Sequence, residues 1–199
     1  MSAQAPRPSL PMPRTLVIHA HPGARRSVVT QALKASFEQP GADVEIRSLY
    51  ELYPDFDIDV AAEQAALLRA DLIVWLAPIH WYSVPALMKH WIDQVLLHGW
   101  AYGHGTQALR GKATWWVTSA GAAVEAYTAN GVHGRPFADF IPPIEQTARF
   151  CGMRWLPPFV VHDGHAASPE ERAAACARLQ AQWQQHLAPA TPPANAAHP

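Results

Sequence analysis

Five short apolar runs rich in β-branched residues alternate with longer stretches of helical periodicity along this chain. Runs of this length and composition are typical of strands, and the alternation predicts a parallel sheet covered by helices on both faces. Because Pro157 and Pro158 cannot donate ladder hydrogen bonds, the fifth strand is expected at an edge of the sheet. The expected strands are Thr15 to Ala20, Asp43 to Leu49, Asp71 to Ala77, Ala113 to Thr118 and Arg154 to Val160.

The stretches of helical periodicity lie between and after these strands, as the crossovers of a parallel sheet require. They predict helices at Ser27 to Phe37, Ala61 to Arg69, Pro85 to Leu97, Ile144 to Cys151 and Pro169 to His186. Two three-layer folds compete for such a chain, the six-strand dinucleotide-binding fold and the five-strand order 2-1-3-4-5. Five strands and the lack of a GxGxxG turn favour the second. The predicted fold class is therefore α/β, a flavodoxin-like three-layer sandwich with a five-stranded parallel sheet.

The length of 199 residues suits one domain with a substantial core. Residues 1–13 carry four prolines and no apolar run, and the Ala- and Pro-rich ending 188–199 lacks apolar periodicity, so both are expected to be disordered tails. Residues 14–187 remain as the flavodoxin-like domain. No stretch has the roughly 20 apolar residues needed to cross a bilayer, and no signal-peptide pattern is present. We therefore expect a cytoplasmic protein.

The composition excludes several classes of function. A formal net charge of -1 provides no electrostatic attraction to nucleic acid. Two cysteines, Cys151 and Cys176, are too few for a disulfide scaffold and fit a reduced cytoplasm. His19 and His21 share one face of the first strand, but no third ligand stands at a recognisable spacing, so no metal site is expected. His21, directly before Pro22, is better interpreted as shaping a loop that lines a ligand crevice.

The first expected strand runs into the segment HAHPGARRS, and Ser27 opens the next helix with Thr30 in its first turn. Exposed amides and the dipole at a helix start favour an anion, and two hydroxyl groups there would complete a phosphate cradle. Ser27 is also a common N-cap residue, so a purely structural role stays open. Arg25 and Arg26 either help to attract the phosphate or are simply solvated.

The third expected strand runs into PIHWYSVPALMKHWID, residues 78–93, where aromatic and polar side chains crowd one loop. In a doubly wound sheet this loop lies at the carboxyl ends of the strands, beside the crevice where ligands bind. We expect Trp81 and Tyr82 to contact a flat aromatic ligand, with backbone groups of Ile79 and His80 at its polar edge. The alternative is that the two aromatic side chains only cover the core.

The fourth expected strand ends in TSAGAAVEAYTANGVHG, residues 118–134, a long loop rich in small residues. Small residues let main-chain amides approach a ligand closely, and such amides stabilise negative charge that develops on a ring such as a flavin. Tyr127 and His133 on this loop form a candidate proton-donating pair. A disordered surface loop is an equally good interpretation of this motif by itself.

Four long segments resemble one known family. They are residues 44–67 (VEIRSLYELYPDFDIDVAAEQAAL), 70–93 (ADLIVWLAPIHWYSVPALMKHWID), 98–112 (HGWAYGHGTQALRGK) and 151–162 (CGMRWLPPFVVH). In these segments the chain is similar to the flavodoxin-like NAD(P)H:quinone oxidoreductases, and within them to the ancillary flavoproteins of glutathione-gated bacterial potassium-efflux systems, the Kef type. The resemblance implies bound FMN and a homodimer with the active site near the subunit interface. It also implies two-electron reduction of quinones or similar electrophiles by NADH or NADPH.

The resemblance also implies site residues, carried over by motif. The FMN phosphate and ribitol would be held by His21, Ser27, Val28, Val29 and Thr30. The ring would be bordered by Pro78, Ile79, His80, Trp81 and Tyr82, and its pyrimidine side by Thr118, Ser119, Ala120 and Gly121. The loop from Tyr127 to Gly134 is similar to that of the animal quinone reductases, where a Tyr/His pair assists charge relay, which gives Tyr127 and His133 this role. The family commonly has Asn in place of Thr30 and Gly in place of Ala120.

The favoured function is an FMN-dependent NAD(P)H:quinone oxidoreductase with a ping-pong cycle, in which both substrates use one pocket in turn. FMN is preferred to FAD on the resemblance and because the Pro-rich C-terminus offers no segment to cover an adenine. The alternative is a regulatory subunit of a potassium-efflux transporter, peripheral to the inner membrane through that partner. An electron-carrier flavodoxin is disfavoured because such carriers are strongly acidic, whereas this chain has 15 Lys+Arg against 16 Asp+Glu.

Overall fold

The structure, a computed structural model, describes residues 14–23, 27–105 and 107–188. Its five strands form one all-parallel sheet in the order β2-β1-β3-β4-β5, which confirms the predicted flavodoxin-like arrangement. Each strand ends within one residue of its predicted bounds. The strands are β1 (Thr15–His19), β2 (Val44–Ser48), β3 (Leu72–Pro78), β4 (Ala113–Ser119) and β5 (Arg154–Val161).

Every helix predicted from periodicity is present, with its ends shifted by up to two residues. These helices are α1 (Val28–Ala35), α3 (Val60–Arg69), α4 (Ala86–Val95), α5 (Pro142–Phe150) and α6 (Pro169–Leu187). Three further elements of the described residues were not predicted, because each is too short to show a periodicity. They are α2 (Leu49–Leu52) and the 3-10 helices η2 (Val124–Ala126) and η3 (Phe137–Phe140).

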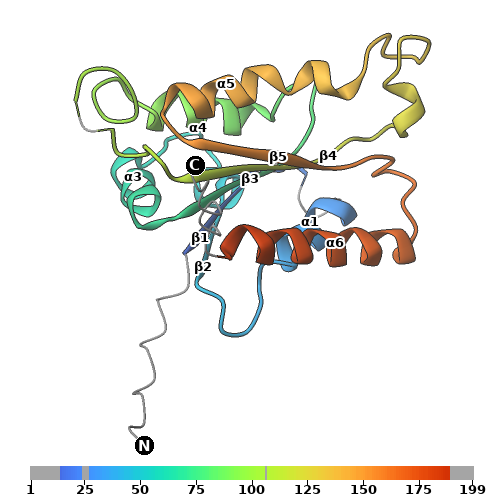
Figure 1. Cartoon of the computed structure of the whole chain (residues 1–199), viewed down its shortest axis with the longest axis horizontal. Helices are drawn as coiled ribbons and strands as arrows, with labels where there is room; N and C mark the ends of the chain where they lie inside the picture. Colours follow the sequence, from blue (N-terminus) through green and yellow to red (C-terminus); the bar gives the residue numbers. More distant parts are fainter. Residues whose placement is uncertain (1–13, 24–26, 106, 189–199) are drawn as a thin grey trace, which may run out of the picture.

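Helices α1 and α6 cover one face of the sheet, and α3, α4 and α5 cover the other, as Figure 1 shows. Neighbouring side chains of a strand point to opposite faces, so each strand supplies both cores. On β4, Trp115 packs with the α1 and α6 side chains, and Trp116 packs with those of α3, α4 and α5. All seven residues of β3 and of β4 are buried, which explains their continuous apolar runs.

Strand β5 lies at an edge of the sheet, as its prolines predicted. Trp115 of β4 pairs with Leu156, whereas Val117 pairs with Phe159, so the register shifts where the two prolines stand. The indole Nε1 of Trp115 donates to the carbonyl oxygen of Pro157 over 3.0 Å. An edge strand tolerates this irregularity because one of its sides needs no ladder partner.

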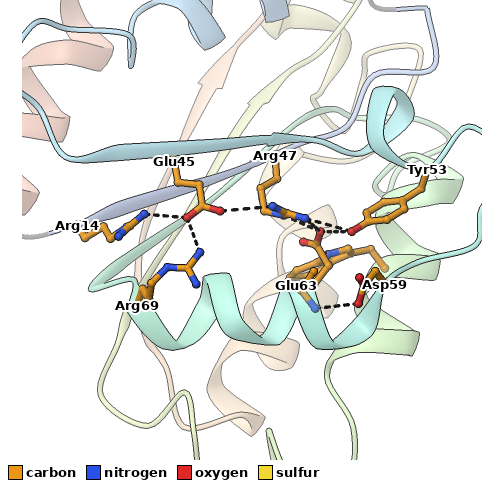
Figure 2. A network of polar contacts seen from close by, with 9 residues as sticks. Arg14, Glu45, Arg47, Tyr53, Asp59, Glu63 and Arg69 are labelled. Atoms are coloured by element: carbon orange, nitrogen blue, oxygen red, sulfur yellow. Dashed lines mark hydrogen bonds and ion pairs between the residues drawn. The ribbon is translucent and has the colours of Figure 1, made fainter.

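The opposite edge strand, β2, is fastened to α3 by a buried polar network (Figure 2). Glu63 of α3 is fully buried, and its Oε1 lies 2.6 Å from the guanidinium of Arg47 on β2. The hydroxyl of Tyr53 donates to the same oxygen over 2.6 Å, and Nε1 of Trp91 on α4 donates to Oε2 over 2.8 Å. The network therefore holds β2, α3 and α4 together through one carboxylate.

Several expectations concern absences or the ends of the chain. Within the described ranges, no helix is both long and apolar enough to cross a membrane. The same ranges contain no group of three or more His, Cys, Asp or Glu residues that could hold a metal ion. The expected tail at 1–13, all of the expected tail at 188–199 except Ala188, and Arg25 and Arg26 lie outside the described residues.

Candidate cofactor and substrate site

Two cavities lie at the carboxyl ends of the strands, where the loops after β1, β3, β4 and β5 meet. The larger, of about 480 Å³, adjoins the start of α1 and is bordered by His21, Ser27, Val28, Val29, Pro78, His80, Ser119, Ala120 and Gly164, among others. The smaller, of about 430 Å³, is bordered by aromatic side chains, namely Trp81, Tyr82, Tyr127 and His133. Ile79, Gly121 and His165 line both cavities, so the two are adjacent. Both volumes are typical of small-molecule sites.

Ser27 both caps α1 and borders the larger cavity. Its Oγ accepts a hydrogen bond from the backbone N–H of Thr30 over 3.2 Å, which is the N-cap interaction. The N–H groups that open a helix have no acceptor within it, and Val28 and Val29 border the cavity at this point. Thr30 does not border the cavity: it is 1% exposed, and its Oγ1 lies 3.4 Å from Oγ of Ser119.

The histidines after β1 are held in defined orientations. Nδ1 of His21 accepts a hydrogen bond from the backbone N–H of Gly23 over 3.0 Å, so this side chain does shape its loop. Burial, and then the nearby His80, lower the pKa of His21, and burial lowers the pKa of His80. Both imidazoles are therefore neutral at pH 7. Deeper in the sheet, burial lowers the pKa of His19 to about 4.

The loop after β3 forms a tight turn. The backbone groups of His80 and Ser83 exchange two hydrogen bonds, of 2.8 and 3.0 Å, across Trp81 and Tyr82. Both central residues have positive φ, 46° at Trp81 and 64° at Tyr82, as a type I′ turn requires. Trp81 is 92% exposed and therefore does not cover the core, whereas the ring of Tyr82 stacks on Phe140 at 4.9 Å.

The long segment between β4 and α5 contains the 3-10 helices η2 and η3, and η2 lies within the loop 118–134. The rings of Tyr127 and His133 stack with centroids 4.3 Å apart and planes 24° apart. Burial, followed by the charge of Tyr82, raises the pKa of Tyr127, which keeps its phenol protonated. Thr118 is fully buried and does not border either cavity, whereas Ser119, Ala120 and Gly121 do.

The loop after β5 also contributes to the site, although no sequence motif indicated it. Gly164 and His165 of this loop border the larger cavity, and His165 also borders the smaller one. Backbone hydrogen bonds of 2.9 Å join Gly164 N–H to the carbonyl of Ala120, and Asp163 N–H to that of Ala122. The predicted strand order could have indicated this loop. Because β5 lies beside β4 in that order, the loops that follow these two strands meet at one edge of the sheet.

Comparison with known proteins agrees with this architecture. A family model described as a flavodoxin-like fold matches residues 13–187. The chain belongs to this flavodoxin-like family. One relative, the glutathione-regulated potassium-efflux system ancillary protein KefF of Klebsiella aerogenes, is 52% identical over 149 residues, which cover 74% of this chain and 81% of the relative.

Two solved structures share the fold and about a third of the sequence. General stress protein 14 of Treponema denticola, in complex with FMN, is 36% identical with a TM-score of 0.79, covering 88% of this chain and 100% of that one. An NADPH-quinone reductase from P. pentosaceus is 32% identical with a TM-score of 0.74, covering 89% of this chain and 99% of that one.

Proposed function

We propose that the chain is an FMN-dependent NAD(P)H:quinone oxidoreductase. The observation that carries this proposal is the pair of adjacent cavities at the carboxyl edge of the sheet. One adjoins the start of a helix, which suits a phosphate, and the other is bordered by aromatic side chains, which suit flat rings. The named activity of one neighbour and the FMN complex of another support the same assignment.

The described lining fits FMN. His21, Ser27, Val28 and Val29 would hold its phosphate and ribitol, while Pro78, Ile79, His80 and the segment 119–121 would border its ring. Thr30 and Thr118 would support this lining from behind, because their side chains are buried. FMN, when bound, supplies two-electron hydride chemistry, and the protein contributes orientation and charge stabilisation.

Tyr127 and His133 would serve as the acid–base groups of the reaction. Tyr127 is 7% exposed and borders the smaller cavity, where its raised pKa keeps a proton available for donation. His133 lies against it in the stacked pair. Because NAD(P)H and quinone would occupy the same cavity in turn, the kinetics should follow a ping-pong pattern.

The decisive experiment begins with the colour of the purified protein. We expect a flavin absorbance spectrum, release of FMN rather than FAD on denaturation as identified by mass spectrometry, and oxidation of NADH or NADPH that depends on added quinone. Parallel lines in double-reciprocal plots of the initial rate against NAD(P)H concentration, measured at several quinone concentrations, would support the ping-pong order. Colourless protein that takes up neither FMN nor FAD would overturn the proposal.

A second candidate function follows from the KefF relative, whose name describes an ancillary protein of a potassium-efflux system. At 52% identity over 149 residues, we infer that this chain also binds a transporter of that class as a homodimer on its cytoplasmic side. Co-purification with the transporter and reduced potassium efflux in cells that lack the protein would support this function. Size-exclusion chromatography with light scattering tests the homodimer separately.

A further inference from the structure

The ring of His133, which stacks on Tyr127, also contacts a hydrogen-bonding partner, Tyr82. Its Nδ1 lies 3.4 Å from the hydroxyl oxygen of Tyr82, which stands 51 residues earlier in the chain, on the turn after β3. The two rings meet edge to face, with centroids 5.6 Å apart and planes 82° apart. Both residues border the smaller cavity, so this contact joins the loops after β3 and β4 across the candidate substrate site.

The backbone of the turn directs Tyr82 toward this contact. A left-handed conformation is unfavourable for a residue other than glycine, and the turn holds two such residues, Trp81 and Tyr82. Strain of this kind persists where the surroundings over-determine it, and it concentrates at functional sites. Here the stacking of Tyr82 on Phe140, at 4.9 Å and 27°, fixes the ring from the side.

The surroundings of the other ring nitrogen decide where His133 carries its proton. Nε2 of His133 is buried and has no hydrogen-bond partner among the described residues. A buried N–H without an acceptor is rarer in proteins than an under-satisfied acceptor, so when the ring carries a single proton that proton is on Nδ1. The Nδ1–H then donates to the oxygen of Tyr82. This leaves the O–H of Tyr82 without an acceptor in the pair.

The O–H of Tyr82 can turn into the smaller cavity, because the side chain is 45% exposed and borders it. We propose that Tyr82 is a substrate-contacting residue whose O–H donates to a carbonyl oxygen of the electron acceptor, and that His133 positions it through the Nδ1–H bond. The inference rests on the proposed function and deepens it: the acceptor is recognised by a carbonyl, as a quinone offers. Tyr127 borders the same cavity and supplies a second phenol.

The tautomer of His133 tests the positioning step without any activity. We expect ¹⁵N NMR of histidine-labelled holoprotein at pH 8 to show a protonated Nδ1 and an unprotonated Nε2 for His133. The Tyr82→Phe variant, which removes the acceptor oxygen, should shift this ring toward the Nε2–H form. A wild-type ring that is already protonated on Nε2 would overturn the proposal.

Binding of duroquinone to the reduced enzyme, followed by stopped flow without oxygen, tests the substrate contact. Loss of one neutral hydrogen bond predicts a dissociation constant about three- to ten-fold higher in Tyr82→Phe. The matched control is Tyr102→Phe, a phenol that borders neither of the two cavities, which should leave this constant unchanged. An unchanged constant in Tyr82→Phe would refute the contact.

Two variants of His133 distinguish its hydrogen bond to Tyr82 from the space that its side chain fills. In His133→Asn the amide nitrogen stands near the place of Nδ1 and can still donate to Tyr82, whereas in His133→Gln it stands near Nε2. The Asn variant should therefore bind duroquinone more tightly than the Gln variant. The ratio of their dissociation constants should be close to the ratio between Tyr82→Phe and the wild type. Equal binding would exclude the positioning role. Failure of the wild type to reduce any quinone would instead overturn the proposed function. The NMR result on the tautomer of His133 does not depend on that activity.

Discussion

The imidazole of His165 lies directly against the backbone of Gly121. A Cβ placed on Gly121 would come within 2.5 Å of both Cδ2 and Nε2 of this ring, closer than real side chains approach. The contact joins the loop after β5 to the loop after β4, between the two cavities that both residues border. The absence of a side chain at position 121 therefore sets the place of His165 in the site.

Replacing Gly121 by Ala should weaken cofactor binding more than it weakens the fold. The methyl group displaces the ring of His165, which is exposed and can move, toward the cavities that it borders. We expect the FMN dissociation constant, measured by fluorescence titration, to rise about ten-fold, as a loss of roughly 1.4 kcal/mol of binding free energy predicts. The double variant Gly121→Ala/His165→Ala removes the collision and should recover most of the affinity. A double variant as weak as Gly121→Ala would argue against steric displacement.

The cap and the phosphate roles of Ser27 can be separated with two substitutions. Ser27→Ala removes the acceptor for Thr30 N–H and should lower the free energy of unfolding by about 1 kcal/mol in urea titrations of the apoprotein. Ser27→Asp keeps a good cap, so its stability should stay near that of the wild type. Its carboxylate would repel the FMN phosphate, and FMN affinity should fall while the affinity for riboflavin, which lacks the phosphate, changes little. Equal losses for both ligands would contradict a phosphate site beside Ser27.

The fold could be predicted from the sequence because its determinants are local. β-branched runs mark β1, β3 and β4, and the two prolines of β5 indicate an edge. Candidate site residues could also be predicted, since the loops after parallel strands meet at one edge of the sheet. The 3-10 helices η2 and η3 were not predicted, because three or four residues show no period.

Contacts between distant loops could not be predicted from the same patterns. The pair Tyr82 and His133 depends on a turn in which two aromatic residues adopt positive φ, a conformation that propensities disfavour. His165 stands in a loop without a motif, and only the finished topology places it against Gly121. Thr30 was expected at the phosphate, but the direction of the first helical turn buries its hydroxyl beside Ser119.

The buried His19 predicts a loss of stability in acid. Burial is the largest cause of its low pKa, with Lys34 and His21 contributing, and the folded value of about 4 lies below the ordinary 6.5. As the pH falls, His19 therefore binds its proton in the unfolded chain before it does so in the folded protein. The contribution of neutral His19 to the free energy of unfolding is complete above pH 6.5 and is lost as the pH falls toward 4. Over that range wild type should lose about 3 kcal/mol more of its unfolding free energy than His19→Asn. Urea titrations at several pH values measure this difference, and parallel pH profiles would exclude His19 as its source.

Burial, rather than distance, should decide what an ion pair contributes to the stability of this protein. The pairs Arg47–Glu63 and Lys89–Asp93 have the same separation of 2.6 Å, but the Glu63 side chain is 0% exposed and those of Lys89 and Asp93 are 59% and 53% exposed. Glu63→Gln keeps the shape and removes the charge, so that Glu45, at 3.4 Å, is the one acidic partner left to Arg47 among the described residues (Figure 2). We expect it to lower the free energy of unfolding by about 3 kcal/mol or more, since breaking a buried pair strands the partner's charge.

Lys89→Gln provides the matched control for Glu63→Gln. Because water and counterions screen the exposed pair, this variant should change the free energy of unfolding by about 0.5 kcal/mol or less. Added salt should reduce the small change in unfolding free energy caused by Lys89→Gln. It should leave the change caused by Glu63→Gln nearly the same, since a buried pair is screened much less. Similar losses in the two variants, or a strong salt dependence at Glu63, would mean that the network in Figure 2 is open to solvent and does not fasten β2 to α3.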